Sequence, residues 1–298
     1  MIYIYDEEQL LNYWCVGFLE VDTGKVFRYE VYKCGDIVVN QLEQFTQFVA
    51  NCKQRGDTWV GFNNLFYDYP KIHRVIEQSL YYRRTSKDNF LNWNIDDLLQ
   101  VLYKLSQEII AEQDSRRRTM SIPVNKHHVK QIDLFKVWHL DNMAKLTSLK
   151  QLEINMDLEL VEDMPLPYDQ EVHIEDIPLI SMYNDNDLHA THKFYNITIG
   201  NTYLPLYKGQ NKLKLREELS EKYGINLTNS NDVAIGKDII THRIAERLDM
   251  EERELRKLRT YRESVPISEV ILPHISFNTP LFNGILEKYQ KMVVTPEI

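Results

Sequence analysis

The order of short β-prone segments and helical patterns constrains the fold of this chain more than any other feature. Three apolar runs come first, and the turn Asp22-Thr23-Gly24-Lys25 between the second and third is typical of a β-hairpin. Two more such runs follow, each after a helical pattern. The five predicted strands are Ile2–Tyr5, Trp14–Glu20, Val26–Tyr32, Trp59–Phe62 and Val129–Leu134. This order predicts an α/β fold with a mixed five-stranded sheet flanked by helices.

Helical patterns divide the chain into a main domain and a tail. We predict a domain over residues 1–198, within which 81–130 form a helical insertion carrying a basic loop at Arg116-Arg117-Arg118. Residues 157–178 contain three prolines and many acids, which indicates a loop. Residues 199–298 are predicted to be an α-helical extension. The predicted helices are Leu42–Cys52, Tyr69–Leu80, Ile95–Ala111, Ser148–Met156, Leu179–Tyr195, Asn211–Lys222, Asp232–Leu248 and Pro280–Met292.

Composition excludes several classes of protein. No apolar run is long enough to predict a membrane span, and no basic segment precedes an apolar core near Met1, so we expect neither a membrane anchor nor a signal peptide. The three cysteines form no paired motif, which favours a reducing compartment. We therefore expect a cytoplasmic protein.

The net charge of −9 is unevenly distributed along the chain. Taken alone it argues against a partner rich in phosphate, because phosphate contacts require basic groups. Residues 131–200, however, hold 13 acidic and 4 basic groups, whereas residues 80–130 hold 9 basic and 6 acidic groups. A local acidic centre balanced by divalent cations, beside a basic segment, is compatible with a polyanionic substrate.

Four acidic residues lie on or next to three predicted elements that could converge at one end of the sheet. Asp6 and Glu8 follow the first strand at i, i+2, so they share a face if the strand continues. Asp68 precedes a helix, and Asp187 lies on a later helix one turn after Tyr183. Carboxylates that converge repel each other unless cations neutralise them, and oxygen ligands favour Mg²⁺ or Mn²⁺.

These positions resemble the motifs of the DEDD superfamily of 3′–5′ exonucleases. The first motif, D-x-E, matches Asp6-Glu7-Glu8, and the second, N-x-x-x-[FY]-D, matches Asn63 to Asp68. The third, Y-x-x-x-D, matches Tyr183 to Asp187 and marks the tyrosine subtype. The stretch 1–198 resembles the exonuclease domain of bacteriophage DNA polymerases. Glu7 stands where the family has an apolar residue, so Glu7 and Glu8 are both candidate ligands, and Glu8 fits the spacing.

The resemblance implies a ribonuclease H-like fold and hydrolysis of DNA with two Mg²⁺ or Mn²⁺ ions. By analogy, Asp6 bridges both ions, Glu8 and Asp187 complete the site of the ion that carries the attacking water, and Asp68 acts on the second ion. Tyr183 would orient the water. The implied substrate-binding residues are Asn63 or Asn64, Phe66 and Lys150, which would contact the 3′-terminal nucleotide or its phosphate.

Several alternatives remain open from the sequence. The loop residues Arg116, Arg117 and Arg118 either contact single-stranded DNA or are simply solvated. Because the chain lacks polymerase motifs, it is either a proofreading domain of a phage DNA polymerase or a separate protein associated with one. An RNA exonuclease and a catalytically silent single-strand-binding module of the same fold are the alternative functions. His189 and His192 lie at i, i+3 without a third nitrogen or sulfur ligand nearby, so we predict no zinc there.

Overall fold

The computed structural model describes residues 1–85, 94–114, 120–142, 144, 146–161 and 163–295. The chain forms two compact units, Met1–Ile239 and Ile240–Ile298. The first unit thus extends past residue 198, where the sequence analysis places the end of the main domain.

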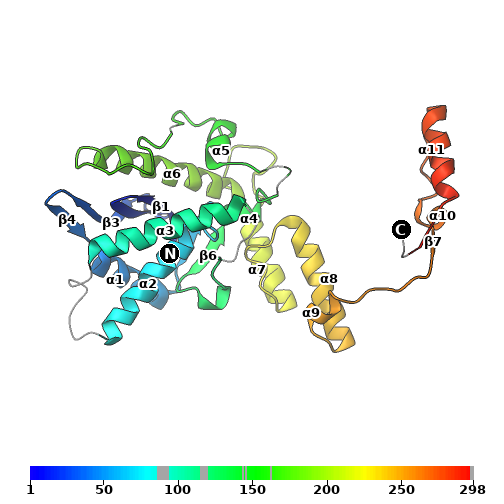
Figure 1. Ribbon diagram of the computed structural model, residues 1–298, viewed down its shortest axis with the longest axis horizontal. Helices are drawn as coiled ribbons and strands as arrows, with labels where there is room; N and C mark the ends of the chain where they lie inside the picture. Colours follow the sequence, from blue (N-terminus) through cyan, green and yellow to red (C-terminus); the bar gives the residue numbers. More distant parts are fainter. Residues whose placement is uncertain (86–93, 115–119, 143, 145, 162, 296–298) are drawn as a thin grey trace. The chain divides into compact units, whose positions relative to one another are not determined.

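A mixed six-stranded sheet forms the centre of the first unit (Figure 1). The strand order is β4-β3-β2-β1-β5-β6. The first four strands pair antiparallel. Strand β5 pairs in parallel with β1, and β6 pairs in parallel with β5. The strands are β1 (Ile2–Leu10), β2 (Tyr13–Glu20), β3 (Val26–Cys34), β4 (Ile37–Asn40), β5 (Thr58–Gly61) and β6 (Lys130–Asp133).

The prediction of an α/β fold with a mixed, helix-flanked sheet is confirmed, but the prediction of five strands was wrong. The additional strand is β4, which pairs with β3 at the edge of the sheet. Its apolar run, Ile37 to Val39, has only three residues, fewer than the roughly four to eight typical of a strand, and so it was not predicted. Gly35, with φ of +60°, forms the turn between β3 and β4, a conformation that glycine adopts without steric cost.

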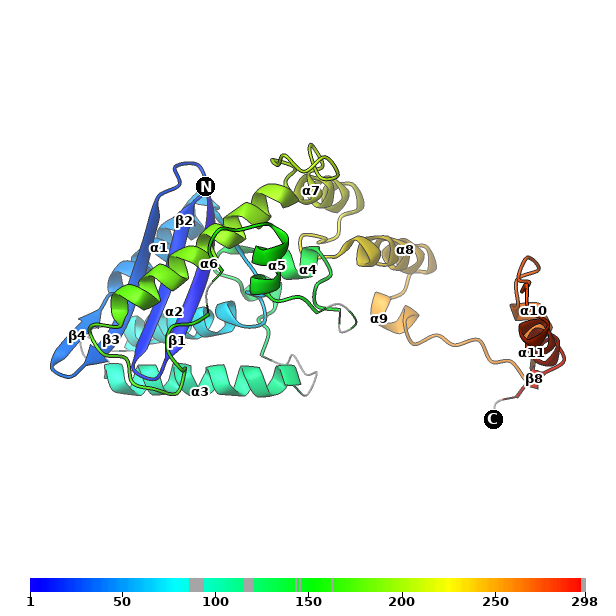
Figure 2. The ribbon, with the colours of Figure 1, turned by 90° about the horizontal axis from the view of Figure 1, so that it is seen from above.

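Helices cover both faces of the sheet (Figures 1 and 2). One face packs against α1 (Leu42–Arg55), α2 (Asp68–Thr85) and α3 (Ile95–Asp114), and the other against α4 (Leu134–Val137), α5 (Leu149–Asn155) and α6 (Ile177–Thr198). Ser148 begins α5, where its hydroxyl accepts a hydrogen bond from the Gln151 amide at 3.1 Å, as its position in the sequence predicts.

The two faces have separate apolar cores. Tyr3, Tyr5 and Trp59 pack against α1–α3, whereas Ile4 and Val60 pack against α4–α6. This alternation along β1 is the period of two expected of a strand buried on both sides. The predicted insertion contributes to the first core, since its helix α3 buries Leu98, Leu99 and Leu102 there.

The first unit ends with α7 (Lys212–Tyr223) and the start of α8 (Asp232–Leu248). The second unit contains the rest of α8, then α9 (Glu252–Leu255), α10 (Ile267–Val270) and α11 (Pro280–Gln290). It also holds an antiparallel pair of short strands, β7 (Val265–Pro266) and β8 (Val293–Val294), which were not predicted from the sequence. Of the described helices, none is both long and apolar enough to cross a membrane.

Candidate metal centre

Strand β1 presents two acids to α6. The strand continues to Leu10, well beyond the predicted end at Tyr5. Asp6 and Glu8 therefore lie on the face that Ile4 shares with α6, which satisfies the condition stated from the sequence.

Helix α6 brings the third motif against these acids. It approaches β2 closely because Gly17, the partner of Asp6 across the strands, has no side chain. A Cβ atom at Gly17 would lie 2.0 Å from Asn184 Oδ1. The Asn184 amide donates a hydrogen bond to Asp6 Oδ2 at 3.0 Å. This contact orients the helix so that Asp187, one turn further on, joins the acids of β1.

The three carboxylates form a group that could hold a metal ion. One ligand oxygen each from Asp6, Glu8 and Asp187 lies within 4.8 Å of the others. Asp68, the first residue of α2, lines the same cleft, which has a volume of about 1030 Å³. Tyr183 also lines it. The structure thus brings together all five residues that the motifs identified as catalytic candidates.

The electrostatics of the group favour added positive charge. Burial, together with the negative charges of its neighbours, raises the pKa of Glu8 to about 8 and that of Asp187 to about 7. The same causes raise the pKa of Asp6 well above its usual range. Burial raises the pKa of Asp68 to about 6, although Lys71 opposes this shift. Such a set of oxygen donors fits hard divalent cations, which neutralise mutual repulsion that protonation would otherwise relieve.

Glu7 lies on the opposite face of β1 from Asp6 and Glu8. Its fully buried carboxylate forms an ion pair with the Lys71 ammonium of α2, which is also fully buried. The Lys71 nitrogen lies 3.5 Å from the centre of the Tyr67 ring. Burial raises the pKa of Glu7 to about 7, and Lys71 opposes this shift. Glu8 rather than Glu7 therefore belongs to the carboxylate group.

The second motif divides into residues that line the cleft and one that supports it. Asn63 and Phe66 line the cleft. The loop is held by Asp133, which accepts hydrogen bonds from the amides of Asn63 at 3.0 Å and Leu65 at 3.3 Å. Asn64 is fully buried, and its amide donates to the Tyr5 hydroxyl at 2.9 Å. Of the two asparagines, Asn63 is thus the one that a substrate in the cleft can reach.

The lysine that the resemblance assigned to the substrate phosphate lies outside the cleft. Lys150 is on α5, and it forms an ion pair with Asp163 at the surface. Ser148, Leu149 and Gln151 of the same segment do line the cleft. The structure therefore brings α5 to the cleft but directs this lysine to a surface acid instead.

The basic loop of the predicted insertion follows α3 in the chain. Its residues Arg116, Arg117 and Arg118 lie outside the described residues. Their contact with single-stranded DNA therefore stays a prediction, as does the alternative that they are only solvated.

Sequence reasoning missed three residues that shape the centre. Glu153 of α5 is buried, and the negative charge of its carboxyl group helps to raise the pKa of Asp187. Asn184 contacts Asp6, and Asp133 holds the second motif loop. Asn184 lies within the third motif, Asp133 within a predicted strand and Glu153 within a predicted helix. Their signal was a polar residue at a position where the local periodicity expects burial.

Comparisons with protein families, with curated proteins and with solved structures found no match for this chain. Its function is therefore argued from the motifs and from the geometry of the carboxylate group.

Proposed function

We propose that this chain is a metal-dependent 3′–5′ exonuclease that hydrolyses DNA, and that its first unit is a ribonuclease H-like domain of the DEDD type. One observation carries the proposal. Asp6, Glu8 and Asp187 offer oxygen atoms within 4.8 Å of one another, and Asp68 lines the same cleft. The four acids come from three separate segments, in the order of the three motifs.

Asp6, Glu8 and Asp187 would hold divalent cations. Asp68, at the start of α2, would act on the second of these ions. When bound, two such ions activate a water molecule and stabilise the attacking and leaving oxygens of a phosphodiester. The half-buried carboxylates are preorganised for this role, since α6 is fixed against β1 through Asn184.

Tyr183 acts as a hydrogen-bond donor in this proposal. Burial and the negative charges of its neighbours, Asp187 first among them, raise the pKa of Tyr183 above the usual range. A phenol that stays protonated at neutral pH cannot accept a proton from water. Tyr183 therefore orients the attacking water, and its replacement by phenylalanine lowers the rate without removing the metal ligands.

Asn63 and Phe66 suit the end of a nucleic acid strand. Both line the cleft that contains the acids. An aromatic ring stacks on a base of any sequence, and an amide can hydrogen-bond a base or sugar. Such contacts fit an enzyme that removes nucleotides without regard to sequence, as proofreading in association with a phage DNA polymerase requires.

The test uses the full chain with 5′-labelled single-stranded DNA and RNA of the same sequence. With Mg²⁺ or Mn²⁺ we expect a ladder of products shortened from the 3′ end of DNA. EDTA and the Asp187→Asn variant should each abolish the ladder. Asp185→Asn is the matched control, because Asp185 lies on the same helix but pairs with Arg28 instead of lining the cleft.

The remaining outcomes separate the alternatives. Degradation of RNA but not DNA would favour the RNA exonuclease. Binding of single strands without cleavage, at several Mn²⁺ concentrations, would favour the silent module and contradict the proposal.

A further inference from the structure

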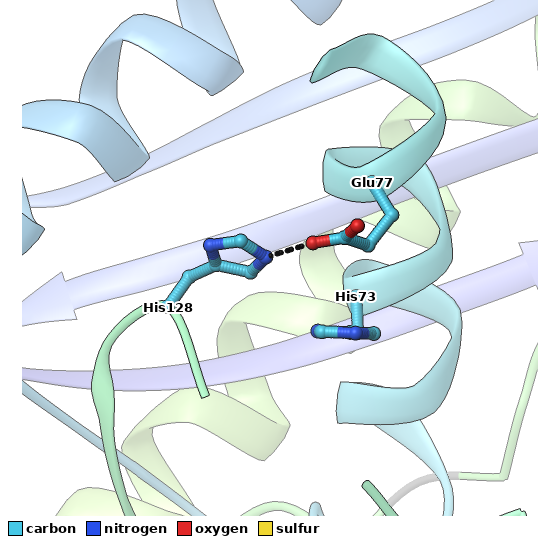
Figure 3. A group of neighbouring side chains, drawn as sticks. All are labelled: His73, Glu77 and His128. Atoms are coloured by element: carbon cyan, nitrogen blue, oxygen red, sulfur yellow. Dashed lines mark hydrogen bonds and ion pairs between the residues drawn. The ribbon is translucent and has the colours of Figure 1, made fainter. Parts of the chain in front are cut away.

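A second cluster of metal-binding side chains lies on the other face of the first unit. His73 and Glu77 occupy adjacent turns of α2, and His128 lies in the segment that leads into β6 (Figure 3). One ligand atom from each lies within 4.8 Å of the others. His128 Nε2 and Glu77 Oε1 are 2.7 Å apart.

A hydrogen bond from its backbone to Tyr69 fixes the His128 segment against α2. Tyr69, one turn before His73 on α2, is fully buried, and its hydroxyl accepts a hydrogen bond from the His128 amide at 2.8 Å. The ring of His73 lies 5.1 Å from that of His128. Tyr69, His73 and Glu77 thus form a stripe along one side of α2, against which the His128 segment is fixed.

The donor set differs in chemistry from the acidic cleft. It offers two imidazoles and one carboxylate, a combination found around Zn²⁺ in sites that keep a fourth position open. His73 Nδ1 is buried and has no hydrogen-bond partner among the described residues. A buried nitrogen without a partner is costly unless something binds it. Donor atoms around four-coordinate Zn²⁺, at about 2.0–2.2 Å from the metal, lie ~3.3 Å apart, so a small closure of the cluster suffices.

We propose that His73, Glu77 and His128 form a Zn²⁺-binding site, separate from the carboxylate centre, that links α2 to the segment preceding β6. Helix α2 begins at Asp68, and β6 ends at Asp133, which holds the loop of the second motif. A bound Zn²⁺ therefore stabilises two elements that frame the acidic cleft. The site does not depend on the proposed exonuclease activity, because none of its ligands lines that cleft.

The experiment measures metal binding by the full chain in excess Mg²⁺. Mg²⁺ prefers oxygen ligands and occupies the carboxylate centre, so it leaves the histidine site free. Zn²⁺ is titrated by calorimetry, and Co²⁺ is titrated as a spectroscopic probe of histidine ligation. We expect one ion bound per chain, a visible Co²⁺ absorption band and a rise in Tm on adding Zn²⁺. Binding should persist in the Asp6→Asn/Asp187→Asn variant.

Three substitutions identify the ligands. His128→Gln keeps a donor for Glu77, and His73→Phe keeps a ring beside Tyr69, yet each should weaken Zn²⁺ binding at least about tenfold. Glu77→Gln tests the third ligand at an exposed position where folding is not at risk. His189→Gln/His192→Gln, on α6, is the matched control and should bind Zn²⁺ as the unmodified chain does.

Two results would overturn the proposal. One is the absence of saturable Zn²⁺ and Co²⁺ binding in the unmodified chain. The other is binding that the control pair weakens, or that all three ligand substitutions leave unchanged.

Discussion

The two faces of β1 place their acidic residues in opposite electrostatic surroundings. Facing α2, Glu7 is paired with Lys71, so the charge is balanced within the protein. Facing α6, Asp6 and Glu8 meet another acid, Asp187, and the pKa of each is raised. A buried ion pair is complete as it stands, whereas converging carboxylates need protons or external cations. We therefore propose that the first face is structural and that the second is the one that binds metal.

The strongest test of this contrast is Asp6→Asn. Removing a carboxylate at the centre of the group should lower nuclease activity by about a thousandfold or more, roughly 4 kcal/mol of transition-state stabilisation. The fold should survive, because the variant also removes repulsion. Activity on end-labelled DNA and Tm in EDTA are the measurements. A fall in Tm that accounts for the lost activity would contradict the division between the two faces.

The matching test on the other face is Lys71→Met. It leaves Glu7 buried without its cation and should lower the free energy of unfolding by about 3–5 kcal/mol at pH 8. Part of the loss should be recovered at pH 6, because the pKa of Glu7 is already about 7 beside Lys71 and rises further without that cation, so Glu7 takes up a proton.

Denaturant unfolding of Lys71→Met and of Glu7→Gln/Lys71→Met provides the measurement and its control. The double variant has no unpaired charge and should be more stable than the single one. If both variants are equally unstable, the role of Lys71 is packing rather than charge.

How far the sequence predicts the site depends on the periodicity of each segment. The period of two along β1 places Asp6 and Glu8 together once the strand is known to reach Leu10. The period of α6 aligns Tyr183 with Asp187 in the same way. These local regularities are why the motif residues, and the choice of Glu8 over Glu7, could be anticipated.

Contacts between distant segments could not be predicted in this way. The pairing of Glu7 with Lys71 spans 64 residues, and that of Glu153 with Asp187 joins two helices, so no local pattern encodes either. Strand β4 was missed for a different reason, since its apolar run of three residues, Ile37 to Val39, is shorter than that of a typical strand.

Gly17→Ala tests how the α6 face is held together. The added methyl group would lie 2.0 Å from Asn184 Oδ1 and 3.0 Å from a Leu188 methyl, so either the Asn184 side chain turns away or α6 moves away from β2. We expect a loss of about 1–3 kcal/mol in the free energy of unfolding, because an inserted methyl overpacks the contact. Activity should fall more than this loss of stability alone would cause, because the first shift removes the hydrogen bond to Asp6 and the second displaces Asp187.

The control for Gly17→Ala is Asn184→Ala, which removes the hydrogen bond to Asp6 without forcing the helix away. The Gly17→Ala/Asn184→Ala double variant should regain stability relative to Gly17→Ala. Unchanged activity in Gly17→Ala would show that the approach of α6 does not set the position of Asp187.

The last test concerns the part of the pH dependence of stability that the acids of the α6 face contribute. In EDTA the folded-state pKa values of Glu8, about 8, and Asp187, about 7, lie above those of the unfolded chain, so the folded state binds more protons between about pH 4 and pH 8. The contribution of these acids to stability is therefore greatest at low pH and is lost as the pH rises through their folded-state pKa values.

Tm measured from pH 5 to pH 8 should fall less in Asp6→Asn/Asp187→Asn than in the unmodified chain, and less with Mn²⁺ than with EDTA. Glu7, with a pKa of about 7, titrates in the same range, but it is common to both proteins, so the difference between the two curves isolates the acids of the α6 face. Parallel curves in EDTA would mean that the acids of the α6 face do not interact, and the contrast with the Glu7–Lys71 face would then be lost.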